Sequence, residues 1–171
     1  MDKSELILNE DGSVYHLKLK PENLSSKIIL VGDQFRVDKI TKHFEKIEFK
    51  VQNREFKSVT GYYNSNRITV ISTGIGSGNI DIVLNELDAL VNINLNTGEL
   101  NKSLKKLELI RIGTSGAIQK DIPVDSFLIS KMAIDVDGFL LNYDLANRDN
   151  TKFNNHIYKE HQIEDDMYCY N

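Results

Sequence analysis

The chain has 171 residues, enough for one domain with its own hydrophobic core. Its 21 Lys and Arg residues against 25 Asp and Glu residues give a formal charge of −4, which argues against a general nucleic-acid binder. The hydrophobic share of 40% is too high for a disordered chain, and no apolar run is long enough to span a membrane. The N-terminus lacks the basic and apolar stretches of a signal peptide, and the single cysteine, Cys169, fits a reducing cytoplasm.

The first part of the sequence alternates strand and helix patterns. Residues 14–19 alternate between apolar and polar and predict a short strand, and residues 27–32 form a continuous apolar run typical of a buried parallel strand. Asp33 can cap the helix that follows, whose apolar side chains recur at helical spacing at Val37, Ile40, Phe44 and Ile47. Further strands are predicted over residues 47–51, 56–63 and 68–72, with a hairpin turn at 64–66.

The second part begins with a glycine loop at residues 73–79 and a strongly amphipathic helix over residues 80–91. A polar surface excursion is then predicted at 94–106, a buried strand at 107–112, a second glycine cluster at 113–117 and a strand at 125–136. Residues 142–171 show no clear period, and neither a repeat nor a domain linker interrupts the chain. This alternation predicts one α/β domain over residues 1–171 with a central, largely parallel sheet.

Both glycine clusters directly follow predicted buried strands, where ligands bind in open α/β sheets. Glycines there let backbone N–H groups approach an anion, although they equally make tight turns after strands. A dinucleotide fingerprint is excluded because Asn79 stands where the third glycine is needed. No nucleoside-triphosphate loop of the Gly-x-x-x-x-Gly-Lys-Ser/Thr type occurs, so the remaining ligand hypothesis is a simpler anion.

Only five of the basic residues are Arg, which suggests that Arg is kept where a planar, bidentate donor is needed. Arg36 lies in the first turn of a predicted helix, where the helix dipole disfavours a cation unless Asp33 or a bound anion compensates. Arg111 lies near the end of a predicted buried strand and needs an acidic or anionic partner there. The four histidines show no metal-ligand spacing, and no nucleophilic triad stands out.

Four segments, in this order, resemble the motif set of the nucleoside phosphorylase-I family, most closely its uridine phosphorylases. They are residues 32–37 (Gly-Asp-Gln-Phe-Arg-Val), 53–56 (Asn-Arg-Glu-Phe), 72–76 (Ser-Thr-Gly-Ile-Gly) and 111–118 (Arg-Ile-Gly-Thr-Ser-Gly-Ala-Ile). Tyr15-His16-Leu17 and Glu86-Leu87 also fit. The resemblance implies a three-layer domain with a central mixed sheet flanked by helices, of which this chain is the N-terminal portion, incomplete at its C-terminal end.

The resemblance also implies site residues. Gly32, Arg36, Arg111 and Thr114 bind phosphate in that family, Arg36, Arg111 and Thr114 being the catalytic set, and Arg54 reaches the phosphate of a neighbouring subunit. Thr114 also contacts ribose, and His16 contacts the ribose in the neighbour's site. The expected assembly is a homodimer or a trimer of dimers with shared sites.

Glu55 and Ile75 match the family's monovalent-cation site, which implies potassium, although Asn79 replaces the usual Ser. No other cofactor is implied, and phosphate is the co-substrate. Gln34 replaces the usual Pro, which only prearranges the helix start.

The expected reaction is phosphate-dependent cleavage of a nucleoside, with uridine favoured, to free base and ribose 1-phosphate in the cytoplasm. Nucleic acid and membrane are not expected partners. Two alternatives stay open. A water-using nucleosidase of related fold would have no use for three phosphate arginines. An inactive phosphate- or nucleoside-binding or dimerisation module would fit the absence of the family's base and ribose segments from these residues.

Overall fold

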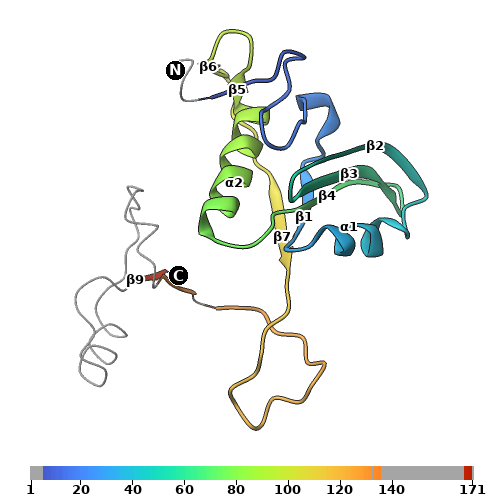
Figure 1. Cartoon of the computed structure of the whole chain (residues 1–171), viewed down its shortest axis with the longest axis vertical. Helices are drawn as coiled ribbons and strands as arrows, with labels where there is room; N and C mark the ends of the chain where they lie inside the picture. The colour runs from blue at the N-terminus through green and yellow to red at the C-terminus, as the bar shows by residue number, and fades with distance from the viewer. Residues whose placement is uncertain (1–5, 132, 136–167, 171) are drawn as a thin grey trace. The chain divides into compact units, whose positions relative to one another are not determined.

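The structure, a computed structural model, describes residues 6–131, 133–135 and 168–170 (Figure 1). The chain divides into two compact units, Met1–Thr114 and Ser115–Asn171. The first unit carries all of the predicted site residues, and a single domain over residues 1–171 stays a prediction.

A five-stranded sheet forms the centre of the first unit. Its strands lie in the order β2-β3-β4-β1-β7, with bounds β1 (Lys27–Val31), β2 (Lys46–Asn53), β3 (Phe56–Tyr63), β4 (Asn66–Ser72) and β7 (Glu108–Ile112). β1 pairs in parallel with both β4 and β7, whereas β2, β3 and β4 form an antiparallel meander. The sheet is therefore mixed, as predicted, and its parallel part is the side that carries both glycine clusters.

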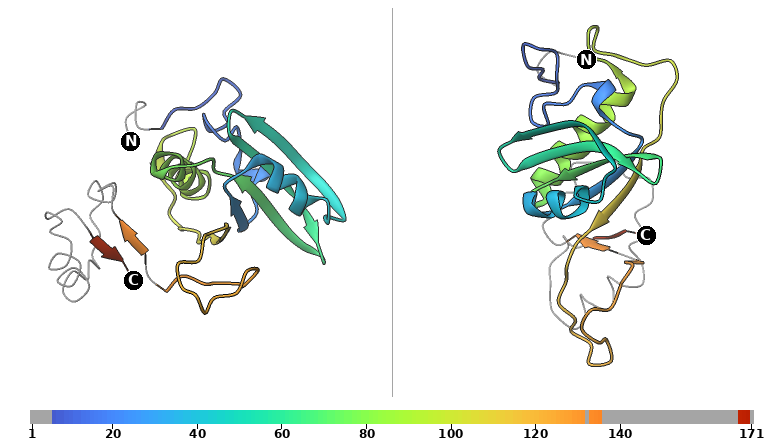
Figure 2. Two further views of the ribbon diagram at one scale, coloured as in Figure 1. Left: turned by 60° about the horizontal axis from the view of Figure 1, so that its bottom comes forward. Right: turned by 90° about the vertical axis from the view of Figure 1, so that its right-hand side faces the viewer.

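Two helices cover opposite faces of this sheet (Figure 2). Alternate residues of β1 show the arrangement: Ile28 and Leu30 pack in the core under α2 (Ser77–Asn92), and Val31 packs with Val37 of α1 (Gln34–Thr41). Because successive side chains of a strand point to opposite faces, the two cores lie on the two sides of the sheet. The expected three layers are confirmed.

Helix α1 begins as predicted and ends earlier. The Asp33 side chain accepts a hydrogen bond from the backbone N–H of Phe35 at 2.9 Å, which is the expected N-terminal cap. The helix ends at Thr41, because Glu45 already donates its backbone N–H to the Tyr62 carbonyl at 2.8 Å. The apolar helical pattern continues to Ile47, but pairing with β3 begins before it, so Ile47 belongs to β2.

The strand predicted over residues 14–19 is wrong. The segment is a turn with a single bridge between Leu8 and Val14, followed by the short 3-10 helix η1 (Pro21–Asn23). Two backbone N–H groups that would pair with a neighbouring strand instead donate to a side chain. The carboxylate of Glu86 accepts hydrogen bonds from the N–H groups of His16 and Leu17. Alternation alone does not reveal such competition from distant side chains.

The turns between strands follow their residue types. Asn64 and Ser65 both have left-handed backbone, with φ of 47° and 60°, as the tight β3–β4 hairpin requires. The predicted surface excursion holds a small hairpin, β5 (Ile93–Asn94) with β6 (Glu99–Leu100). Across the described ranges, no helix is long and apolar enough to cross a membrane.

In the second unit, β8 (Ala133–Asp135) pairs antiparallel with β9 (Tyr168–Tyr170). The strand predicted over 125–136 is too long, because residues 125–131 are irregular and exposed. The unpatterned tail predicted over 142–171 contains β9, and its residues 142–167 and 171 lie outside the described residues.

Candidate phosphate and nucleoside site

Three chain segments converge where the parallel strands end. The register places Leu30 beside Arg111 and Val31 beside Ile112, so β1 and β7 end together. A Cβ atom built on Gly32, just after β1, would lie 3.7 Å from the Gly74 carbonyl oxygen and 3.8 Å from Arg111 Nη2. Gly32, Gly74 and Arg111 therefore meet at the carboxyl edge of the sheet, the usual position of a ligand in open α/β sheets.

Arg36 reaches the same edge from α1. Its Nη1 donates to the carbonyl of Ile112 at 3.3 Å, one residue beyond Arg111 on β7. Two guanidinium groups from different elements thus reach the end of β7, that of Arg111 beside Gly32 and that of Arg36 at the Ile112 carbonyl. Thr114, the other predicted phosphate residue, is exposed and follows the end of β7. Of the predicted phosphate residues, the fold brings Gly32, Arg36 and Arg111 together and leaves Thr114 close along the chain.

The charges of Arg36 and Arg111 are not neutralised by a carboxylate in the part of the chain that the structure describes. Arg67 shows the contrast: its guanidinium donates to Glu48 Oε2 at 2.6 Å and to two backbone carbonyls at 2.7 Å. Arg67 is therefore a structural arginine, whereas Arg36 and Arg111 keep donors available for an anion.

The expectation that Arg111 is buried is wrong. All five residues of β7 are exposed, because β7 is an edge strand with β1 on one side. Because Arg111 is exposed, burial does not demand a partner for its charge. The case for an anion site depends instead on the convergence with Gly32 and Arg36.

Arg54 lies in the turn between β2 and β3 with a left-handed backbone, φ 53°. The side chain of Gln34, at the start of α1, donates through Nε2 to the Arg54 carbonyl, and Gln34 Oε1 accepts from Gln52 at 2.8 Å. Within the described residues no hydrogen bond joins Arg54 to Arg36 or Arg111. The residue that replaces the family's Pro thus fixes the Arg54 turn, which sequence reasoning missed.

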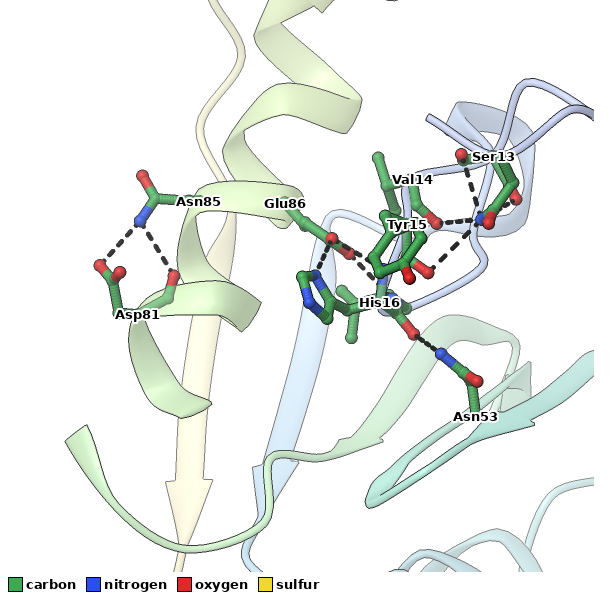
Figure 3. A network of polar contacts seen from close by, with 10 residues as sticks. Ser13, Val14, Tyr15, His16, Asn53, Asp81, Asn85 and Glu86 are labelled. Atoms are coloured by element: carbon green, nitrogen blue, oxygen red, sulfur yellow. Dashed lines mark hydrogen bonds and ion pairs between the residues drawn. The ribbon is translucent and has the colours of Figure 1, made fainter. Parts of the chain in front are cut away.

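His16 is held by two elements, as Figure 3 shows. Its Nδ1 and its backbone N–H both lie 2.8 Å from Glu86 Oε1 on α2, and its carbonyl accepts from Asn53 Nδ2 at 2.9 Å. A quarter of its side chain is exposed, beside a pocket of about 260 Å³ that Tyr15 also lines. His16 lies apart from Arg36 and Arg111, without a contact to either among the described residues.

The predicted cation residues lie close together around Gly74. A Cβ atom on Gly74, whose φ is +70°, would meet Asn79 Nδ2 at 2.7 Å and Glu55 Cγ at 2.9 Å. Asn79 Nδ2 donates to the Ile75 carbonyl at 3.2 Å, which places an N–H donor where the family has a serine. So oriented, Asn79 donates to the Ile75 carbonyl and does not supply the hydroxyl oxygen of the family's serine. The cation stays a prediction, and no step of the reaction below uses it.

The comparisons with known proteins identify the family and the fold. Residues 26–170 match the family model described as "Phosphorylase superfamily". The uridine phosphorylase of Thermococcus kodakarensis is 33% identical over 134 residues, which are 78% of this chain and 43% of that relative. A purine nucleoside phosphorylase of the DeoD type from Oceanobacillus iheyensis is 33% identical over 69% of this chain and 45% of its own length.

A solved structure with the same fold covers nearly all of the chain. The Trypanosoma brucei nucleoside phosphorylase, whose crystal structure is described as showing uridine phosphorylase activity, superposes with a TM-score of 0.83 at 32% identity. The alignment covers 96% of this chain and 57% of that one. The chain spans about half the length of the curated relatives it matches. The chain belongs to the phosphorylase superfamily.

Proposed function

We propose that this chain is part of a nucleoside phosphorylase, with uridine as the favoured substrate. The observation that carries the proposal is that Arg111, beside Gly32, and Arg36, at the Ile112 carbonyl, reach the same carboxyl edge of the sheet. Neither has a neutralising carboxylate in the described part. Two planar cationic donors beside a glycine backbone match the size and charge of inorganic phosphate.

In the proposed reaction a phosphate oxygen attacks the anomeric carbon of the nucleoside. The new C–O bond forms as the N-glycosidic bond breaks, and the base leaves with the bonding electron pair. The proton that the new phosphate ester releases reaches the base through solvent. The products are the free base and ribose 1-phosphate. Arg36, Arg111 and Thr114 would hold and orient the nucleophile, which is mainly a positioning contribution. Attraction between the phosphate and the developing positive charge of the ribose supplies electrostatic stabilisation.

In this proposal, two further residues of the site come from a second subunit. Arg54 and His16 lie on early elements and make no contact with Arg36 or Arg111 in the described residues. We assign them to the site of a neighbouring copy, Arg54 to its phosphate and His16 to its ribose. This assignment implies an isologous dimer, alone or within a trimer of dimers, in which each site needs both chains.

A direct assay tests the reaction. The full-length gene product is incubated with uridine, with and without inorganic phosphate, and uracil and ribose 1-phosphate are quantified. Phosphate-dependent formation of both products is expected. Uracil release that ignores phosphate would instead establish a nucleosidase, and phosphate binding without turnover would establish an inactive binding module.

Substitutions at Arg111 test the site. Arg111→Ala is expected to weaken phosphate binding by roughly 1.5–3 kcal/mol, the range for a hydrogen bond to a charged group. Arg111→Lys should recover only part of this loss, because Lys keeps the charge without the bidentate geometry. Lys39→Ala, an exposed cation elsewhere on α1, controls for net charge. Unchanged phosphate affinity of Arg111→Ala in calorimetric titration would refute the site.

A further inference from the structure

A carboxylate lies on the buried face of α2 without belonging to the proposed phosphate site. Glu86 is 6% exposed and shares its helix face with Val83, Leu87 and Leu90. Its oxygens accept three hydrogen bonds, each 2.8 Å long: Oε1 from the His16 N–H and from His16 Nδ1, and Oε2 from the Leu17 N–H. A buried charge is costly unless it is fully hydrogen-bonded, and here all three bonds go to one turn, seventy residues away.

These bonds decide which nitrogen of the His16 ring carries the proton. An ionised carboxylate only accepts hydrogen bonds, and Oε1 of Glu86 already accepts the backbone N–H of His16. The Nδ1 atom, 2.8 Å from the same oxygen, must therefore be a donor. In the neutral ring the proton on Nδ1 leaves Nε2 as a hydrogen-bond acceptor.

Neighbouring side chains also hold the His16 ring in position. Tyr15 and Phe56 both meet the ring edge to face, at centroid distances of 4.9 and 6.1 Å. Asn53 Nδ2 also donates a hydrogen bond to the His16 carbonyl at 2.9 Å. The backbone of the turn is therefore held by a second element besides Glu86. A quarter of the side chain is exposed, and His16 lines the pocket described above. Figure 3 shows the polar contacts around the ring.

We propose that Glu86 is a positioning residue that locks His16 in the Nδ1-protonated form and presents Nε2 as an acceptor for a sugar hydroxyl group of the nucleoside. The hydroxyl belongs to the nucleoside in the neighbouring subunit's site, so the proposal rests on the proposed function. Specificity follows from the chemistry: an acceptor at Nε2 favours a hydroxyl donor and rejects a sugar that carries only an ether or a hydrogen at that position.

The tautomer can be read without any activity. Two-bond proton–nitrogen correlations of the neutral imidazole distinguish a proton on Nδ1 from one on Nε2. His16 is expected in the Nδ1-protonated form, while the exposed His43 serves as an internal reference. A proton on Nε2, or an equal mixture of forms, would overturn the proposal.

A double-mutant cycle tests the coupling to substrate. His16→Asn places an amide N–H near the position of Nδ1 and keeps the bond to Glu86, but it removes Nε2. Glu86→Gln keeps the side-chain volume but turns one acceptor into a donor. Each is expected to raise KM for uridine about three- to tenfold, the loss of one hydrogen bond. KM for phosphate should stay within about twofold, because the phosphate residues lie on other elements.

The combined variant separates the outcomes. If Glu86 acts through the His16 ring, Glu86→Gln adds no further increase in the His16→Asn background. Effects that multiply, or an equal rise in KM for phosphate, would show that Glu86 only supports the fold. If Glu86→Gln does not fold, the tautomer measurement on the unchanged protein still decides. A wild-type protein that cleaves no uridine would refute the proposed function but leave the tautomer result standing.

Discussion

Lys57 of β3 is buried, with only 9% of its side chain exposed, and its Nζ donates to Asp38 Oδ2 of α1 at 2.5 Å. The hydrogen bond from Lys57 is the main cause that lowers the pKa of Asp38 below its ordinary value, and burial opposes it. Lys50 adds a longer contact, 3.8 Å from Asp38 Oδ1. The pair therefore attaches α1 to the sheet just after the turn that carries Arg36.

Asp38→Asn is expected to lower the free energy of unfolding at pH 7 by about 1–2 kcal/mol, a low value for a charged hydrogen bond because Asp38 is half exposed. A carboxylate whose folded pKa is depressed stabilises the fold above its unfolded pKa of about 3.9. This contribution is lost as the pH falls through the folded pKa. Urea unfolding of both proteins between neutral and acidic pH should therefore show a difference that shrinks below pH ~4.

Lys57→Met provides the matched control for this pair. It fills the space of the Lys stem and leaves Asp38, which water can solvate, whereas Asp38→Asn leaves a buried ammonium group without its anion. The loss for Lys57→Met should be the smaller of the two. A pH-independent loss for Asp38→Asn would show that the ion pair contributes nothing specific.

Single residues of the proposed site could be predicted from the sequence only where they lie at the end of a predicted strand or the start of a predicted helix. Gly32, Arg36 and Arg111 lie together because parallel strands end at one edge, which the sequence pattern implies. The role of Glu86 could not be derived in this way, since its partner is distant in sequence. Its signals in the sequence are the fit of Glu86-Leu87 to the family's motif set and the charged residue within the apolar face of α2, where a buried partner is required.

At the scale of elements, the runs of β-branched residues predicted β1, β3 and β4 closely, and the cap at Asp33 predicted the start of α1. The failures have a common cause. Residues 14–19 and the end of α1 are decided by hydrogen bonds to distant groups, which local periodicity does not contain. The burial of β7 was also wrong, because alternation and apolarity do not reveal which strand lies at the edge of the sheet.

The link between α1 and the β2–β3 turn can be tested through Gln34. Gln34→Glu keeps an acceptor for Gln52 but removes the N–H that is donated to the Arg54 carbonyl. Since these groups are exposed, the free energy of unfolding should change by less than about 1 kcal/mol. Local opening should nevertheless become easier, so amide hydrogen exchange in a peptide covering residues 52–57 is expected to accelerate.

Gln34→Ala should show the same acceleration, and Gln52→Ala only part of it, because the bond to Arg54 survives in the latter. Exchange at unchanged rates in Gln34→Glu would mean that the left-handed turn at Arg54 is held by the β2–β3 pairing alone. That result would leave Gln34 with no part in positioning Arg54.

At the scale of the whole molecule, the proposed site is divided between two regions of the chain. Arg36 and Arg111 lie at the carboxyl edge of the sheet, while Arg54 and His16 are held by the β2–β3 turn and by α2. The exposed apolar residues of β7, among them Ile110 at 64%, also leave an edge that a further strand can extend. The division of the site fits the proposal that Arg54 and His16 serve a neighbouring copy of the chain.

Mixing two inactive variants of the full-length gene product tests the shared site. One parent carries Arg36→Ala and the other Arg54→Ala, and the two are unfolded and refolded together. In a mixed dimer, one site combines an intact Arg36 from one chain with an intact Arg54 from the other, so random pairing should restore about a quarter of the wild-type sites. Mixing Arg36→Ala with the double variant Arg36→Ala/Arg54→Ala should restore none. If native mass spectrometry detects mixed dimers while the first mixture stays inactive, Arg54 does not serve the neighbour's site.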